Sequence, residues 1–256
     1  MGNSHHHAIG IDIGGTGIKG AVVDLRTGKL VTERIKIFTP DGGEPDDILE
    51  ATAELLDKIA EADDAPKLDK LPLGVCFPAI VKDGRTLSAA NVSKKWIGLP
   101  AERLFEQRLD RDIRFVNDAD AAGVAELRNG AAKGVDGLVI LTTLGTGIGS
   151  AMLHNGVLVP NSELGHLEID GHDAESRAAY SAMEREELSW DQWAERLQKY
   201  YSTLEFLFSP DLFVVGGGVS KHPEKFLPKL HLSVPIIAAV HRNNAGIIGA
   251  AGLAAG

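Results

Sequence analysis

The chain has 256 residues, 44% of them hydrophobic, which is enough for one large domain or two small ones. Its net charge of −10 argues against nonspecific nucleic-acid binding, so an anionic substrate would need a locally positive site. The single cysteine, Cys76, excludes an intramolecular disulfide framework and a cysteine-rich zinc site. The N-terminus has no apolar signal region, although the histidines at positions 5–7 could come from an added tag, and no stretch is apolar enough to span a bilayer. We expect a cytoplasmic enzyme that binds neither nucleic acid nor membrane.

Strands and helices alternate in the first half of the chain. The turn Thr27-Gly28 lies between two β-type segments and predicts an antiparallel meander with the strand before them. A helix begins at Pro45, and another occupies 119–129 and ends at Gly130. The predicted strands of this half are 9–13, 21–25, 29–36, 73–77 and 114–116.

The second half repeats this organisation. A strand–loop–strand unit over 138–141 and 150–153 is followed by an amphipathic helix, which ends at Ser209-Pro210 and whose aromatic residues we expect in the core. A strand over 212–215 and a helix over 244–255 complete the chain. The repeat predicts a duplicated α/β architecture with a cleft between two domains. The expected domains are 1–117, completed by 244–256, and 118–243.

Two loops rich in Gly and Thr, one in each half, are the most informative feature. Gly14-Gly15-Thr16-Gly17 follows the first strand, and Leu144-Gly145-Thr146-Gly147 follows the strand that begins the second half. Such loops expose several backbone N–H groups, whose natural partners are phosphate oxygens. Two such loops in one short chain indicate a phosphotransferase in which both loops bind the same phosphorylated ligand.

Three other phosphate-binding motifs are disfavoured. Gly15–Gly20 formally fits G-x-G-x-x-G, but the β-branched segment 21–25 follows it where a dinucleotide site requires a helix. The pair Gly28-Lys29 precedes leucine, which a P-loop does not allow. The His-Arg-Asp motif of protein kinases is absent from the sequence.

The motifs together resemble a known family. Asp-Ile-Gly-Gly-Thr at 12–16 and the second loop are similar to the sugar kinase/actin-like ATPase superfamily, which implies a duplicated actin-like (ribonuclease H-like) ATPase fold. Asn117–Ala122, Glu163–His166 and Val215–Gly218 follow in the order found in the family of bacterial repressors, open reading frames and sugar kinases. Asn91–Gly98 is similar to a segment of the polyphosphate glucokinases of that family.

The resemblance assigns Asp118 as general base toward a sugar hydroxyl. By spacing alone, Asp118 could equally be the N-cap of the following helix. Asp120 is expected to be a surface or capping residue. The residues expected to bind the sugar are Asn91, Asn117, Asp118, Glu163, His166 and Glu175.

The chain departs from many relatives after Glu163–His166, because they carry a zinc-binding cysteine cluster there. His166, Asp170 and His172 could gather a metal, but they lack the thiolates of such a site, and no structural zinc is expected. The absence of this zinc-binding cluster is similar to what is found in polyphosphate glucokinases.

The resemblance places the phosphoryl donor on both loops. We expect Asp12 to act through Mg²⁺, since its carboxylate would otherwise repel phosphate. Lys94 and Lys95 are candidates to hold a polyphosphate chain, although such a pair is commonly just solvated. Gly216, Gly217 and Gly218 match a segment under adenosine in relatives that use ATP, although a tight turn would also explain them. The remaining donor-binding candidates are Gly14, Gly15, Thr16, Lys19, Thr142, Thr143, Gly145, Thr146 and Gly147.

The resemblance therefore implies phosphoryl transfer from inorganic polyphosphate, with ATP as an additional donor, to the 6-hydroxyl of glucose. A homodimer is common among such proteins. The alternatives are a strictly ATP-dependent glucokinase, a glucose/mannose kinase, a sugar-sensing repressor and an actin-like filament or chaperone ATPase. The repressor is disfavoured because the first strand begins near Ile9 and leaves no room for a DNA-binding domain. The filament or chaperone is disfavoured because the chain is short and has the Glu163–His166 motif.

Overall fold

The computed structural model describes residues 6–256, so His5 of the histidine run lies outside the described residues. The chain divides into two compact units, one reaching to Ala125 and including Asn244–Gly256, the other comprising Glu126–Asn243. The boundary falls within α3 (Asp118–Asn129) and not before it. The reason is packing: a Cβ added to Gly249 would lie 1.7 Å from the carbonyl oxygen of Ala121, so the first half of α3 stays with the C-terminal helix.

The first unit is built on a sheet of order β3-β2-β1-β5-β8, with β4 also on β2. Strands β1, β2 and β3 are antiparallel, whereas β5 and β8 run parallel to β1. The strand predicted over 29–36 is two short strands, because the Thr32 hydroxyl accepts the hydrogen bond of Val22 N–H (3.1 Å) where a ladder would continue. The strands are β1 (His7–Gly14), β2 (Gly17–Asp24), β3 (Lys29–Leu30), β4 (Ile35–Ile37), β5 (Leu73–Phe77) and β8 (Arg114–Asn117).

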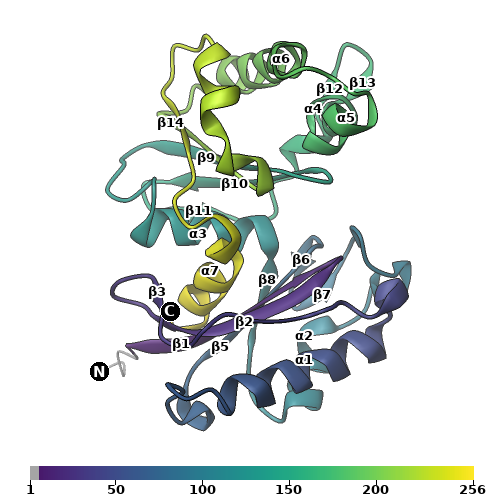
Figure 1. The fold of residues 1–256 in the computed structure, drawn as a ribbon, viewed down its shortest axis with the longest axis vertical. Coiled ribbons are helices and arrows are strands. Elements are labelled where there is room, and N and C mark those ends of the chain that lie inside the picture. The colour runs from purple at the N-terminus through teal and green to yellow at the C-terminus, as the bar shows by residue number, and fades with distance from the viewer. Residues whose placement is uncertain (1–5) are drawn as a thin grey trace. The chain divides into compact units, whose positions relative to one another are not determined.

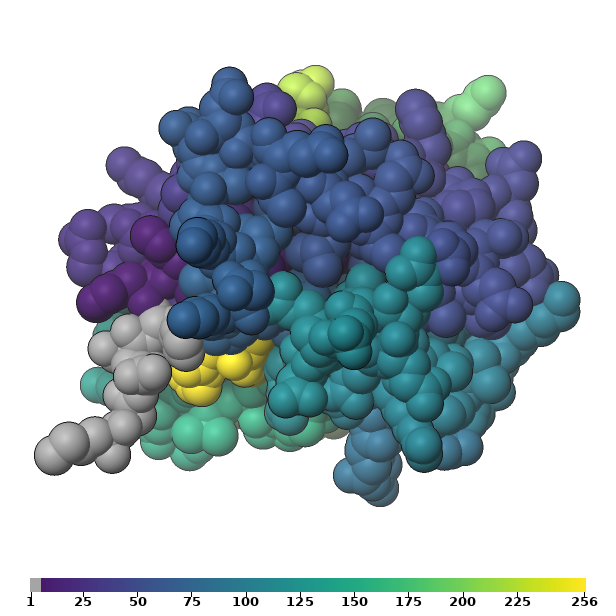
Figure 2. Space-filling view, turned by 90° about the horizontal axis from the view of Figure 1, so that it is seen from below, coloured from purple at the N-terminus to yellow at the C-terminus, as the bar shows by residue number. Residues whose placement is uncertain are grey.

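Helices cover both faces of this sheet (Figure 1). Ile9, Ile11 and Ile13 share a buried cluster with residues of α1 (Pro45–Ala60) and α2 (Ala101–Leu109), because alternate strand residues point to one face. The outer surfaces of α1 and α2, blue and teal, lie side by side in Figure 2. On the other face, α7 (Ala245–Ala254) contacts β1 and β5, and a small hairpin of β6 (Val81–Lys82) and β7 (Arg85–Thr86) lies outside the sheet.

The second unit repeats the topology with the order β11-β10-β9-β14-β15. Again three antiparallel strands are followed by two parallel ones, so the duplication expected from the sequence is confirmed. The strands are β9 (Leu138–Leu144), β10 (Ile148–His154), β11 (Val157–Val159), β14 (Leu212–Gly216) and β15 (Ile236–Ala238).

The amphipathic helix of the second unit is α6 (Trp190–Phe208), which begins with a capping box of Ser189 and Gln192. Trp193, Tyr200 and Tyr201 are buried in the core, which confirms the predicted role of this aromatic face. The hairpin of β12 (Glu168–Ile169) and β13 (His172–Asp173), with the short helices α4 (Ala174–Ala178) and α5 (Tyr180–Arg185), was not expected. Single 3₁₀ turns occupy Asp41–Gly43, Leu68–Lys70, Lys94–Trp96, Leu164–His166, Gly218–Lys221, Pro223–Lys225, Leu227–Lys229 and Arg242–Asn244. Among the described residues, helices long and apolar enough to cross a membrane are absent.

Candidate active site

In the first unit, the acidic residues predicted to take part in the reaction lie at the carboxyl ends of the parallel strands. The strand register places Asp12 beside Cys76, and Cys76 beside Val116. Asn117 and Asp118 follow directly on β8 and the start of α3. This edge of a parallel sheet is where α/β folds bind their ligands.

Asp12 is held by three neighbours. Its Oδ2 lies 3.3 Å from Lys19 Nζ across the β1–β2 hairpin, and its Oδ1 accepts a weak hydrogen bond from Cys76 Sγ at 3.7 Å. Burial raises the pKa of the Cys76 thiol, and the charges of Asp12 and Asp118 raise it further, so the thiol stays protonated. A Cβ on Gly246 of α7 would lie 2.8 Å from Asp12 Cγ. Cys76 belongs to none of the sequence motifs, because its contact with Asp12 depends on strand register.

The first Gly/Thr loop forms the tip of the β1–β2 hairpin, because Gly14 and Gly17 face each other in the register. A Cβ on Gly15 would lie 2.7 Å from the carbonyl oxygen of Asn91. Asn91, expected at the sugar, therefore packs against the backbone of this loop. Its φ of 58° is the left-handed conformation that asparagine tolerates well.

The start of α3 separates the roles of its polar residues. The Asn117 side chain accepts the Asp120 N–H (3.0 Å) and donates to the Ala79 carbonyl (3.0 Å), so the capping bond comes from Asn117. Asp118 is the first helical residue, and its Oδ1 accepts the N–H of Ala119 at 2.9 Å. Asp120 was expected at the surface or as a cap, and the surface position is wrong: the residue is buried, because α3 turns this position inward.

The second unit brings together the residues Glu163, His166 and Glu175, which were predicted to bind the sugar. His166 Nδ1 lies 2.8 Å from Asp173 Oδ2, and ligating atoms of His166, Asp173 and Glu175 all lie within 4.8 Å of one another. The hydrogen bond with Asp173 raises the pKa of His166. Burial raises the pKa of Glu163, and Glu175 raises it further, whereas His166 lowers it. Asp173 was missed as a site residue, because α4, whose N-cap it is, is too short to show a period in the sequence.

Glu175 also joins this cluster to the second Gly/Thr loop. Its Oε2 accepts the N–H of Ile148 at 3.0 Å, and a Cβ on Gly147 would lie 2.5 Å from the same oxygen. The loop is further held by Ser181, whose N–H and hydroxyl bond the carbonyl oxygens of Gly145 and Thr146. The loop therefore has a fixed backbone conformation next to the sugar-reading cluster.

The other residues predicted to bind the phosphoryl donor in the second unit lie at several separate positions. The buried Thr142 hydroxyl lies 2.6 Å from the Tyr201 hydroxyl, whereas Thr143 is half-buried beside Gly216 in the sheet. Gly217, with a φ of 83°, makes the tight turn after β14, since a Cβ there would lie 2.4 Å from the Leu144 carbonyl oxygen. Gly218 has open space around it.

The two lysines considered for polyphosphate have partners within the first unit. Lys94 Nζ donates to the Ala89 carbonyl at 2.7 Å, and Lys95 Nζ pairs with Glu44 Oε2 at 2.9 Å. Lys95 is mostly exposed, so its ammonium group can still reach a ligand in solvent.

The potential metal ligands named from the sequence separate in the structure. Asp170 pairs with Lys199, and His172 lies 3.1 Å from Arg177, so neither joins His166. Asp173 and Glu175 take their place beside His166. A structural zinc site of the cysteine type requires thiolate ligands, and this set of three residues contains none.

Comparison with known proteins identifies the family. A model described as the ROK family matches residues 8–178. The chain is 43% identical to the polyphosphate glucokinase of Mycobacterium tuberculosis over 249 residues, covering 97% of this chain and 91% of that protein. It is 53% identical to the crystal structure of the inorganic polyphosphate/ATP-glucomannokinase of Arthrobacter sp. strain KM, with a TM-score of 0.92 over 96% of this chain and 97% of that one. A ROK family glucokinase from Streptomyces griseus, solved with glucose and AMPPNP, is 25% identical with a TM-score of 0.81, covering 97% and 99% of the two chains. The actin-like fold expected from the sequence is thereby confirmed, and the chain belongs to the ROK family.

Proposed function

We propose that the protein transfers the terminal phosphoryl group of inorganic polyphosphate to the 6-hydroxyl of glucose and also accepts ATP as donor. The observation that carries this function is the 43% identity to a polyphosphate glucokinase across 97% of the chain. The geometric support is the two Gly/Thr hairpins and the cluster of polar residues around His166. A sugar kinase needs groups that bind the phosphoryl donor and groups that bind the sugar.

Asp118 is the proposed general base. Its support is its position at the carboxyl edge of the parallel strands, on the first turn of a helix that Asn117 caps. A carboxylate there accepts the proton of the sugar hydroxyl as the phosphorus–oxygen bond forms. The backbone of Asp118 lies at the junction of β8 and α3, so regular hydrogen-bonded structure on both sides prepositions the base.

Glu163, His166 and Glu175 are the residues of the second unit proposed to bind sugar hydroxyls, and Asn117 is the residue proposed for this role in the first unit. An amide, a carboxylate and an imidazole offer both donors and acceptors to the sugar. Asp173 orients His166, because its carboxylate bonds Nδ1 and leaves Nε2 for the substrate.

Both loops are proposed to bind the phosphoryl donor through backbone N–H groups. Lys19 adds a positive charge beside the first loop, and exposed Lys95 is proposed to hold the polyphosphate chain. The oxygen donors of Asp12 suit Mg²⁺ held through water, because Oδ2 pairs with Lys19 and Oδ1 with Cys76, and each oxygen has two lone-pair directions. A bound ion would neutralise charge on the phosphates.

Mannose is a second candidate acceptor, because the relative at 53% identity is named a glucomannokinase. A homodimer is proposed from the resemblance alone, and sedimentation of the purified protein tests it.

The direct test of the reaction is ³¹P NMR of the protein incubated with glucose, Mg²⁺ and polyphosphate as sole donor. We expect the glucose 6-phosphate resonance to grow as the polyphosphate end groups are consumed. A phosphorylated product at another hydroxyl, or no product with either polyphosphate or ATP, would contradict the proposal.

A further inference from the structure

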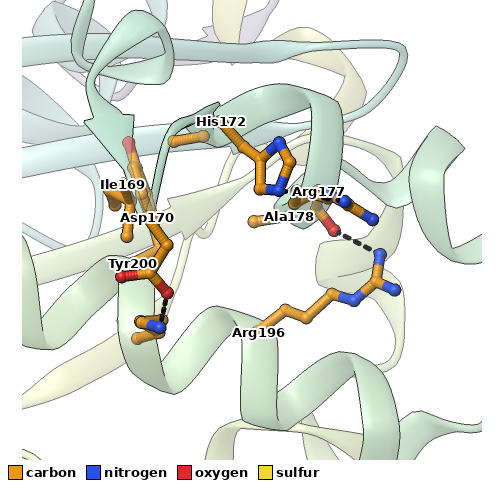
Figure 3. A pocket seen from close by; sticks show the side chains of 9 residues that line it. Ile169, Asp170, His172, Arg177, Ala178, Arg196 and Tyr200 are labelled. Carbon is orange, nitrogen blue, oxygen red and sulfur yellow. Dashed lines mark hydrogen bonds and ion pairs between the residues drawn. The ribbon is translucent and has the colours of Figure 1, made fainter.

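A pocket of about 240 Å³ opens in the second unit between the β12–β13 hairpin, α4 and α6 (Figure 3). None of the residues proposed for catalysis or sugar binding lines it. Part of its wall is apolar and formed by Ile169, Ala174 and Ala178. Pockets for drug-sized ligands span about 300–1,000 Å³, so this one suits a smaller molecule.

The rest of the lining is rich in positive charge. His172, Arg177 and Arg196 border the same space from three different elements (Figure 3). Lys199 also lines the pocket and pairs with Asp170, which is the carboxylate of the lining. Three permanent cations thus face one anion, on a chain whose net charge is −10.

The arginines share a single carboxylate behind the pocket. Glu186 Oε2 lies 2.6 Å from Arg196 Nη2 and 4.0 Å from Arg177 Nη1, and Glu186 Oε1 lies 3.2 Å from Arg185 Nη2. The hydrogen bond with Arg196 is the main cause that lowers the pKa of Glu186 to about 2. One carboxylate cannot neutralise three guanidinium groups, so the cluster keeps excess positive charge. The carboxylate also fixes the arginines in place for a ligand.

We propose that this pocket binds a small phosphate monoester. Arg177 and Arg196 present several N–H donors in the fork geometry that suits phosphate oxygens, and Lys199 adds a point charge. The carbon skeleton of the ligand lies against the apolar wall. Asp170 competes with the ligand for Lys199, so it limits the affinity of the site.

Calorimetric titration with glucose 6-phosphate tests the assignment. Arg177→Gln and Lys199→Gln should each weaken binding by roughly tenfold, the value of one charge-assisted hydrogen bond. Asp170→Asn should strengthen binding, because it releases Lys199. Arg185→Gln is the matched control, since Arg185 also pairs with Glu186 but does not line the pocket.

Inorganic phosphate and tripolyphosphate are the comparison probes in the same titration. Glucose 6-phosphate should bind more tightly than either, because only it has both a phosphate and a carbon skeleton. Equal or tighter binding of inorganic phosphate or tripolyphosphate would overturn the monoester assignment. Binding that is unchanged in both Arg177→Gln and Lys199→Gln, or no saturable binding at all, would overturn the site. Glucose 6-phosphate is also the product of the proposed reaction, so binding at this pocket is the part of the binding heat that Arg177→Gln and Lys199→Gln weaken.

Discussion

At the scale of single residues, the start of α3 separates two roles that the sequence alone could not separate. Spacing left Asp118 equally suited to capping and to catalysis. The side chain of Asn117 takes the capping bond to Asp120 N–H, so the helix does not require the Asp118 carboxylate as its cap. Asp118 is thereby the stronger candidate for the base.

The first prediction concerns that base. Asp118→Asn should keep the fold, because an amide oxygen can still accept the Ala119 N–H, and should lower kcat by roughly 10²–10⁴-fold. Steady-state kinetics with matched thermal unfolding curves measure both effects. A kcat within a few-fold of the unaltered protein would show that the base lies elsewhere.

The second prediction concerns His166. Because the hydrogen bond with Asp173 is the main cause of its raised pKa, Asp173→Asn should move this pKa down toward the ordinary value of 6.5. The pair stabilises the protein fully below pH 6.5, and this stabilisation is lost as pH rises through the raised folded value. NMR titration of the imidazole measures the shift, and Asp170→Asn is a control because Asp170 pairs with Lys199 instead. An unchanged His166 pKa in Asp173→Asn would refute the assigned cause.

At the scale of elements, α7 approaches the sheet of the first unit through glycines. A Cβ on Gly10 would lie 1.9 Å from the Ile247 carbonyl oxygen, and one on Gly74 would lie 2.0 Å from that of Ala250. Backbone atoms cannot yield as flexible side chains do, so α7 can dock on β1 and β5 only over glycine.

The third prediction follows from that contact. Gly10→Ala should lower the free energy of unfolding by about 3 kcal/mol or more, at the upper end of overpacking costs, because α7 must shift. Gly218→Ala is the matched control, since a Cβ there meets open space. Urea unfolding of both variants measures the difference. Equal stability of the two variants would contradict the packing argument.

The elements show where sequence patterns succeed and where they fail. The strand β1, whose isoleucines alternate, and the amphipathic helices α1 and α6 were predicted correctly because their large apolar residues recur with the period of the element. The β12–β13 hairpin and α4 are too short to show a period, and their conformation depends on tertiary contacts.

At the scale of the whole molecule, the duplicated topology could be predicted because each half carries its own Gly/Thr hairpin. Motif order also gave the candidate residues Asp118, Glu163 and His166. What could not be predicted are contacts that depend on register or packing, such as Cys76 with Asp12, and the basic pocket beside α6. Neither follows from spacing along the chain.

The central claim is that polyphosphate is a phosphoryl donor for glucose. The most direct measurement is kcat/KM with glucose for polyphosphate and for ATP, each as sole donor to the purified protein. We predict turnover with both, and a kcat/KM for polyphosphate at least equal to that for ATP. Turnover with ATP alone would contradict the polyphosphate assignment and leave an ATP-dependent sugar kinase.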